Sequence, residues 1–167
     1  MLVDTISLPA TKHGFTHVFV CVDFLSRFAV CKPVRNVTGQ AFAEWLVLEL
    51  IPQYGCPSHL TSDRGTEFVN EICDRMMSVM QVHHRLVTAY RPTANGLVER
   101  LNGTIKTMIK KYAEFDKIQN WSTWLPFIVF AYNNSVHQAT GYTPFFLTHG
   151  REARIPIDVL RAHDDTE

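Results

Sequence analysis

The sequence lacks the long apolar runs and leader segments of membrane and secreted proteins. No stretch approaches the roughly 20 apolar residues that a membrane-spanning helix needs. The first four residues contain neither the basic region nor the apolar core of a signal peptide. We therefore expect an intracellular protein with no membrane partner.

Cysteines are few, and their spacing argues against a structural zinc site. The four are separated by 10, 25 and 17 positions, so none forms a C-x-x-C pair. Three lie within apolar strand or helix patterns, where a free cysteine behaves as a small buried hydrophobe. We interpret them as reduced thiols. The four are Cys21, Cys31, Cys56 and Cys73.

An excess of basic residues is also missing, since the formal net charge is zero. A neutral sum argues against the strongly basic class of nucleic-acid-binding proteins, but the charges are unevenly distributed. Residues 100–117 carry five basic and two acidic residues, whereas residues 38–81 carry two basic and six acidic ones. Residues 151–167 carry three basic and five acidic residues. Positive charge is therefore concentrated in one segment of the chain.

What the chain does contain predicts one globular α/β domain. Its 167 residues are 46% hydrophobic and 19% charged, which is typical of a single domain with a sizeable core. Alternating and β-branched patterns predict strands at residues 2–8, 18–22, 27–34, 59–62 and 83–87. Apolar spacing predicts helices at about 38–53, 66–80, 97–115 and 121–135, with a short helix after Gly141 to Pro144. This order favours a mixed sheet that begins with a hairpin and has helices on its faces.

Asp63 stands where a predicted strand ends, two residues before Gly65. Glycine lets the chain turn sharply, and the next helix is expected to begin at once, from Thr66. An aspartate at such a junction is a favoured helix cap. Taken alone, Asp63 is better explained by capping than by catalysis.

The helix predicted at 97–115 has two unlike faces when its residues are placed about 100° apart. One narrow stripe is polar and contains Glu99, Asn102, Gly103, Lys106 and Lys110. The opposite face is apolar and contains Leu97, Leu101, Ile105, Met108 and Tyr112. A solvated face with Glu–Lys pairs would explain the stripe. It would not explain the mobile loop with Pro92, Asn95 and Gly96 that is expected at 88–96.

Exactly 35 residues separate Asp63 from Glu99, and the sequence around both resembles the Asp-Asp-35-Glu integrases of retroviruses and retrotransposons. The resemblance extends over residues 2–160. Two matching segments surround the carboxylates, 62–68 (SDRGTEF) and 88–102 (TAYRPTANGLVERLN). The downstream segments resemble gypsy-type long-terminal-repeat elements in particular, at 124–126 (WLP), 131–133 (AYN), His137 and 140–145 (TGYTPF). Residues 22–28 (VDFLSRF) are similar to the family's second-strand signature.

The resemblance implies that Asp4 is the first catalytic carboxylate, joined by Asp63 and Glu99. Asp4 precedes Pro9 by a few residues on the first strand, as in the family. Asp23 is the alternative because it also ends a strand, although this position belongs to the hairpin in the family. The implied cofactor is a pair of Mg²⁺ or Mn²⁺ ions, with Asp4 bridging both, Asp63 holding one and Glu99 the other. Such a pair suits an in-line displacement at phosphorus.

DNA, as element ends and as target, is the partner that the resemblance implies. We expect phosphate contacts from Lys106, Lys110 and Arg100 on the predicted helix. Asn95 and Gly96 are expected in the loop beside the site. One departure from the family is an acidic residue, Glu67, where many members carry an uncharged polar residue near target DNA.

The resemblance thus implies a ribonuclease-H-like α/β fold, with a mixed five-stranded sheet flanked by helices. We expect an integrase catalytic core at residues 1–160 and a polar tail at 161–167, acting in the nucleus as a homodimer or higher oligomer. The zinc-binding and DNA-binding modules that flank the core in full integrases are not in these residues, so we expect a fragment or a reduced descendant. Two alternatives remain open: a domesticated non-catalytic DNA- or protein-binding module, and a ribonuclease-H-type nuclease.

Four further residues with ring side chains are given structural interpretations. His83 and His84 begin a strand that is expected to be buried, and no C-x-x-C pair accompanies them. Trp121 and Trp124 are interpreted as core aromatics before they are considered as platforms for base stacking.

Overall fold

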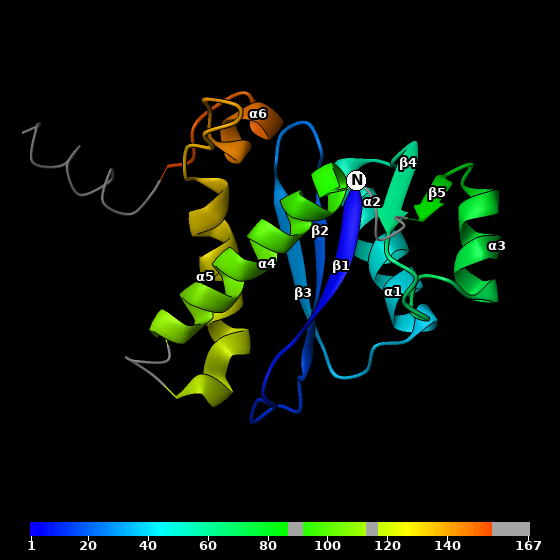
Figure 1. The fold of residues 1–167 in the computed structure, drawn as a ribbon, viewed down its shortest axis with the longest axis horizontal. Coiled ribbons are helices and arrows are strands. Elements are labelled where there is room, and N and C mark those ends of the chain that lie inside the picture. Colours follow the sequence, from blue (N-terminus) through cyan, green and yellow to red (C-terminus); the bar gives the residue numbers. More distant parts are fainter. Residues whose placement is uncertain (87–91, 113–116, 155–167) are drawn as a thin grey trace, which may run out of the picture.

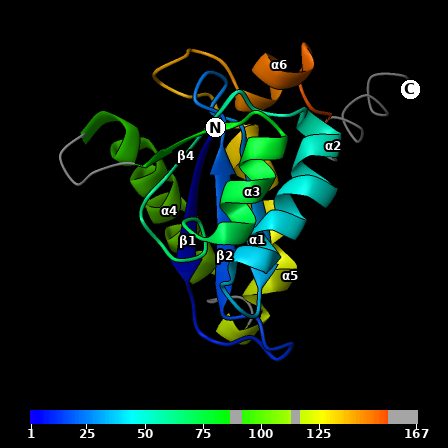
Figure 2. The same ribbon diagram turned by 90° about the vertical axis from the view of Figure 1, so that its right-hand side faces the viewer.

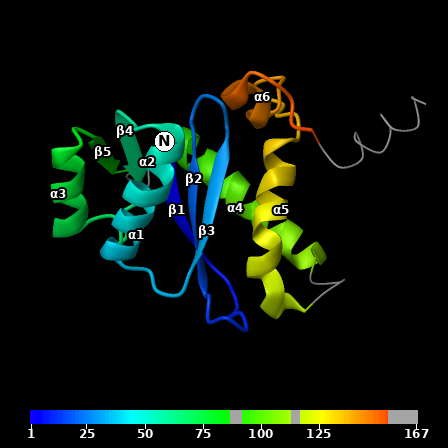
Figure 3. The ribbon, with the colours of Figure 1, turned by 180° about the vertical axis from the view of Figure 1, so that it is seen from behind.

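The computed structural model describes residues 1–86, 92–112 and 117–154, with the side chains of all of these except residues 92–95. A five-stranded sheet forms the centre of this part of the chain, and helices cover both of its faces (Figures 1 and 3). The predicted polar tail at 161–167 lies outside the described residues. No helix among the described residues is long and apolar enough to cross a membrane.

The sheet is mixed, as the sequence predicts. Its strands are β1 (Leu2–Ser7), β2 (His17–Val22), β3 (Ala29–Val34), β4 (His59–Ser62) and β5 (His83–Leu86). They lie in the order β3-β2-β1-β4-β5. The first three pair antiparallel, while β1 with β4 and β4 with β5 pair parallel. The strand β1 is therefore central, with the hairpin on one side and the parallel pair on the other.

Helices follow the strands in the expected sequence. They are α1 (Gly39–Trp45), a π-helical turn (Leu46–Leu50), α2 (Ile51–Tyr54), α3 (Glu71–Val79), α4 (Pro92–Tyr112), a 3₁₀ turn (Ile118–Asn120), α5 (Trp121–Asn133) and α6 (Pro144–His149). Figures 1 and 2 show α4 and α5 on one face of the sheet and α1 and α3 on the other. Each face has its own hydrophobic core.

Alternation along β1 connects the two cores. Leu2 and Ile6 are buried against α4 and α5, whereas Val3 is buried in the core formed with α1 and α3. Successive side chains of a strand point to opposite faces. Asp4 consequently points to the α4 side of the sheet and Thr5 to the α1 and α3 side.

The predicted faces of α4 are confirmed. Leu97, Leu101 and Ile105 are buried in the core with α5, and Lys106 and Lys110 on the opposite face are exposed. Trp121, interpreted as a core aromatic, is 2% exposed, and its indole N–H donates to the Pro9 carbonyl at 2.7 Å. Trp124 packs against the same core and stacks on Tyr112.

Three predicted boundaries or environments are wrong. The helix expected from Thr66 begins at Glu71, because the residues before it form turns and Asn70 provides the cap by accepting from the Cys73 N–H. The helix α4 begins at Pro92 and not at residue 97, so Asn95 and Gly96 belong to the helix and not to a loop. Proline suits a first helical position, since it has no N–H to leave unpaired. The loop residues 88–91 lie outside the described part of the chain.

The strand β5, expected to be buried, is instead an exposed edge strand. The helix predicted at 38–53 is present and is capped as expected, because Thr38 accepts from the Ala41 N–H. Its middle widens into the π-helical turn just before Pro52. A proline inside a helix has no N–H to donate and its ring crowds the carbonyl four residues earlier, which accounts for the local widening.

Candidate active site

Two of the three predicted catalytic carboxylates are brought together by the parallel pairing of β1 with β4. Leu2 lies opposite Thr61 in that pair. Asp4 and Asp63 each lie two residues further along their chains, and they are close enough for their charges to interact. The charge of Asp63 raises the pKa of Asp4. Because β1 and β4 are far apart in sequence, the fold and not chain proximity creates this pair.

Asp63 is not the cap of the following helix. That helix starts at Glu71 and is capped by Asn70. The Asp63 carboxylate instead accepts from the Gly65 N–H at 2.9 Å, which shapes the turn directly after β4, and its side chain is exposed. The capping explanation weighed for Asp63 is therefore removed, and one face of its carboxylate remains available to a ligand.

Asp4 is held by two hydrogen bonds in a partly buried position. One carboxylate oxygen accepts from the Thr5 N–H at 2.8 Å, and the other accepts from the Asn102 side-chain amide at 2.6 Å. Burial raises the pKa of Asp4, these two hydrogen bonds oppose the rise, and the charges of Asp63 and Glu67 add to it. Burial and carboxylate repulsion both favour the neutral form, so bound positive charge would favour the ionised form.

Asn102 connects the carboxylate pair to α4, the helix that carries Glu99. The two residues are three positions apart, so they occupy neighbouring positions on the helix surface. Glu99 is exposed, while the Asn102 side-chain oxygen is buried and has no hydrogen-bond partner among the described residues. Asn102 belongs to the polar stripe predicted from the sequence, but the sequence does not reveal it as the partner of Asp4. Its position one turn after Glu99 was the available signal.

Whether these residues suit a divalent cation depends on their chemistry and on their spacing. Asp4, Asp63 and Glu99 supply only oxygen donors, which Mg²⁺ prefers, and Asp4 has carboxylate neighbours whose repulsion a cation would relieve. As the side chains lie, no group of three or more His, Cys, Asp or Glu in the described part of the chain is close enough to hold a metal. The chemistry of the three carboxylates therefore suits a divalent cation, although the three are not gathered within the distance that a bound metal requires.

Glu67 is a further acidic residue near Asp4 and Asp63, and in the sequence it stands out only as a departure from the family. Glu67 accepts from the Thr5 hydroxyl at 2.9 Å, and its charge contributes to the raised pKa of Asp4. This contact joins β1 to the turns between β4 and α3. Glu67 therefore supports the carboxylate site from the sheet face opposite to α4.

The backbone at Asp63 is fixed by a short chain of hydrogen bonds that the sequence did not reveal. The Ser62 hydroxyl donates to the Asp63 carbonyl at 2.8 Å and lies 2.8 Å from Nε2 of His84. Since the only hydroxyl proton of Ser62 is used in the first bond, Nε2 of His84 acts as the donor in the second. Burial lowers the pKa of His84, with an opposing contribution from Asp74. His84 thus has a structural role at the end of β4.

Asp23, the alternative first carboxylate, serves the β2–β3 hairpin. One of its oxygens accepts from the backbone N–H groups of Leu25 and Ser26 and from the Ser26 hydroxyl. Partial burial opposes ionisation, but the bonds from Ser26 outweigh it and lower the pKa of Asp23. A carboxylate committed to three donors in a turn is explained without a metal.

The predicted DNA-binding residues fall into separate locations. Lys106 and Lys110 are exposed on the Glu99 side of α4, consistent with one charged face. Arg100 follows Glu99 but faces the space between α4 and α5. Gly96 is partly buried in the first turns of α4, and the Asn95 side chain lies outside the described residues.

Comparison with known proteins identifies the family of the chain. The model of the integrase core domain family matches residues 1–92, more than half of the chain. The chain therefore belongs to the integrase core domain family.

Relatives with similar sequences are polyproteins of retroviruses and of a transposon. The Gag-Pol polyproteins of feline leukemia virus and koala retrovirus are 29% and 30% identical over 148 residues, which is 89% of this chain and 9% of each polyprotein. The Pol polyprotein from transposon 412 of Drosophila melanogaster is 27% identical over 164 residues, or 98% of this chain and 13% of that protein. The chain thus spans a small part of the length of these relatives.

Solved structures establish the ribonuclease-H-like fold. A chain of the simian T-cell lymphotropic virus intasome, in complex with the PP2A regulatory subunit B56 gamma, superposes with a TM-score of 0.77 at 24% identity, covering 93% of this chain and 55% of that one. The HTLV-2 integrase catalytic core domain, in complex with magnesium and in a trimeric form, gives a TM-score of 0.70 at 22% identity, covering 89% and 94%. The predicted fold class is confirmed.

Proposed function

We propose that this chain is the catalytic core of a retroelement integrase, a polynucleotidyl transferase that cuts and joins DNA strands. The observation that supports the proposal most strongly is the charge interaction of Asp4 with Asp63, each two residues beyond the paired Leu2 and Thr61, with Asn102 joining Asp4 to the helix of Glu99. Asp4, Asp63 and Glu99 would hold two Mg²⁺ or Mn²⁺ ions, which supply activation of a hydroxyl nucleophile and stabilisation of the leaving oxygen when bound.

The other residues of the site hold and orient these ligands. Asn102 fixes one oxygen of Asp4, and the Thr5 N–H fixes the other. Ser62 and His84 fix the backbone at Asp63. Such support matters because metal ligands and reacting groups need placement within about half an ångström.

DNA would approach over the exposed face of α4. Lys106 and Lys110 lie on the same side of that helix as Glu99 and would contact phosphates, which position the DNA without reading its sequence. We also propose that the chain acts in the nucleus and assembles as a homodimer or larger oligomer. Support for assembly comes from the related chain in an intasome and from the trimeric form of the HTLV-2 core.

The test uses amide variants of two carboxylates and a matched control. Asp63→Asn and Glu99→Gln should each abolish metal-dependent strand transfer, measured both as joining and as the reverse reaction on a branched DNA. Each should also weaken Mg²⁺ binding in calorimetry, because an amide is a poorer ligand than a carboxylate. Glu44→Gln changes an exposed carboxylate on α1 and should leave both readouts unaltered.

Three outcomes would contradict the proposal. Near-normal strand transfer by Asp63→Asn, with folding confirmed by circular dichroism, would exclude Asp63 as a ligand. Cleavage of an RNA–DNA hybrid without any DNA strand transfer would instead identify a ribonuclease-H-type nuclease. Absence of both activities in the unaltered chain, with a folded protein and bound Mg²⁺, would indicate a non-catalytic descendant.

A further inference from the structure

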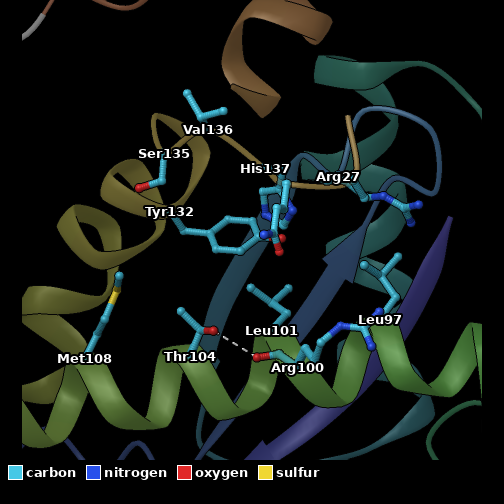
Figure 4. A pocket seen from close by; sticks show the side chains of 12 residues that line it. Arg27, Leu97, Arg100, Leu101, Thr104, Met108, Tyr132, Ser135, Val136 and His137 are labelled. Atoms are coloured by element: carbon cyan, nitrogen blue, oxygen red, sulfur yellow. Dashed lines mark hydrogen bonds between the residues drawn. The ribbon is translucent and has the colours of Figure 1, made fainter. Parts of the chain in front are cut away.

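An open hollow of about 730 Å³ lies between α4 and α5, beneath the turn of the β2–β3 hairpin (Figure 4). Arg27 reaches it from the hairpin and Arg100 from α4, while Tyr132 and His137 approach from the end of α5 and the residues after it. Figure 4 shows the Tyr132 ring directed toward His137, and the two rings meet edge to face at 5.1 Å. We call this space the Arg27–Arg100 hollow.

The hollow is separate from the carboxylate site. Leu97, Leu101 and Thr104 form its wall on α4, on the side of that helix opposite to Glu99 and Lys106. The helix thus stands between the two sites, and Arg100 follows Glu99 directly in the chain. A ligand in the hollow would touch α4 from behind the carboxylates.

The far wall of the hollow is fixed to the sheet by a buried side chain. Asn133 is 4% exposed, and its amide both donates to the Ala29 carbonyl and accepts from the Ala29 N–H, each at 2.8 Å. Tyr132 is next to this clamp, so its position relative to the hairpin that carries Arg27 is set by direct bonds. The hollow is therefore built from rigid elements.

The charge of the hollow is positive and has no counterion among its lining residues. Within the described part of the chain, Arg27 and Arg100 are the charged side chains that line it, and no carboxylate does so. Burial lowers the pKa of His137, and both arginines lower it further. Burial raises the pKa of Tyr132 to about 12, and both arginines oppose that rise. The charges of both arginines are therefore felt at His137 and Tyr132, and this positive charge favours an anion in the hollow.

Arg27 occupies a backbone conformation that does not suit it. Its φ is 66°, in the left-handed region that favours glycine. Its Nε is buried and has no hydrogen-bond partner within the described residues, although its guanidinium lies over the Phe24 ring at 4.9 Å. Strain of this kind and an unused donor are common at ligand sites. The unpaired Nε indicates that an acceptor could be added beside Arg27.

We propose that the Arg27–Arg100 hollow binds a backbone phosphate of a DNA strand, with the adjoining nucleotide against its apolar wall. Guanidinium groups recognise phosphate through paired N–H donors, and aromatic and aliphatic side chains provide contact area for a base. The inference rests on the proposed function in its choice of DNA as the ligand. The proposed contact lies on the side of α4 opposite to Lys106 and Lys110.

The first test measures how DNA binding depends on salt. Loss of one phosphate contact reduces the slope of log K against log salt by about one. Because both arginines would contact the same phosphate, Arg27→Gln and Arg100→Gln should each reduce the slope, and the double variant should reduce it by about one. Arg75→Gln removes an exposed arginine paired with Glu71 on α3 and should leave the slope unchanged. Unchanged slopes for both hollow variants would overturn the proposal.

Two additional variants protect this test against misfolding and against failure of the proposed function. Arg27→Gly suits the left-handed backbone, so it should fold at least as well as the unaltered chain and still show the smaller slope. Asp63→Asn should keep the full slope while losing strand transfer. Retained activity in Asp63→Asn alongside reduced slopes in the arginine variants would refute the catalytic assignment alone.

A direct measurement follows the His137 ring by nuclear magnetic resonance. Titration with a short single-stranded oligothymidylate should shift its resonances and raise its pKa, because a bound phosphate offsets the two arginines. The shift should disappear in Arg27→Gly and persist in Arg75→Gln. An acidic peptide that shifts His137 while the oligonucleotide does not would overturn the proposal and assign the hollow to a protein partner.

Discussion

The hydrogen bond from Asn102 to Asp4 is the most exacting place to test the candidate site. Asn102→Ala removes the donor at 2.6 Å and leaves Asp4 with the Thr5 N–H alone. A hydrogen bond to a charged group contributes about 1.5–3 kcal/mol. Since this pair is only partly buried, we expect the free energy of unfolding at neutral pH to fall by about 1.5 kcal/mol, the low end of that range.

The loss should depend on pH in a defined direction. The amide stabilises the ionised carboxylate, so its removal should raise the pKa of Asp4 further. Once the pH falls below the already raised pKa of Asp4 in the folded protein, the carboxyl is neutral and the lost bond matters less. Urea unfolding of the Asn102→Ala variant should therefore show a smaller difference from the unaltered chain at mildly acidic pH than at neutral pH.

A matched variant makes the result interpretable. Asn134→Ala removes an exposed asparagine amide at the end of α5, where it bonds to the Phe130 carbonyl. Its effect on unfolding should be small and the same at both pH values. If Asn102→Ala lowers the free energy of unfolding equally at neutral and at mildly acidic pH, or does not lower it at neutral pH, then Asn102 does not stabilise the charge of Asp4.

Three further predictions concern charge and backbone strain. The pKa of Asp4 is raised in the folded protein. The stability that protonated Asp4 contributes is therefore complete at pH values below the pKa of Asp4 in the unfolded chain, and it is lost as the pH rises through the pKa of Asp4 in the folded protein. Asp4→Asn should thus raise the urea midpoint at neutral pH and abolish stabilisation by added Mg²⁺. The pKa of Asp23 is lowered in the folded protein. The stability from its hydrogen bonds is therefore present at pH values above the pKa of Asp23 in the unfolded chain, and it is lost as the pH falls through the pKa of Asp23 in the folded protein. Asp23→Ala should cost about 1–2 kcal/mol at neutral pH and less in acid, measured by the same unfolding experiment. Arg27→Gly should stabilise the chain by about 1 kcal/mol in thermal denaturation, since φ is 66° there, and a decrease would contradict the strain argument.

Much of the fold could be predicted from local pattern because each pattern matches the burial of its element. Alternate residues of β2 are buried in the two cores on opposite faces of the sheet, and the apolar face of α4 is buried in one of these cores. The boundaries failed where a local preference competed with another. Thr66 was expected to begin a helix, but Asn70 caps α3 instead. Gly96 indicated a loop, but Pro92 begins α4 four residues earlier.

The site was predictable only in part for a different reason. The spacing of Asp63 and Glu99 is a property of the chain, so a family resemblance could identify it. The contacts of Asn102 with Asp4 and of Thr5 with Glu67 join segments 98 and 62 positions apart. No local pattern encodes such pairs, because they depend on how α4 and the turns after β4 pack on the sheet.

The alternation of β1 has a consequence for how the chain can fail. Asp4 lies opposite Val20 and Thr5 opposite Phe19 in the pairing with β2, so neighbouring residues serve opposite layers. A slip of one position would turn every side chain of the strand to the other face, bringing a hydroxyl to Asn102 and the carboxylate to Glu67. A strand in the wrong register therefore forms no partial site, and only molecules with this strand in its native register contain the candidate site. One residue inserted within β1 should be far more harmful than one inserted in the loop at residues 8–16.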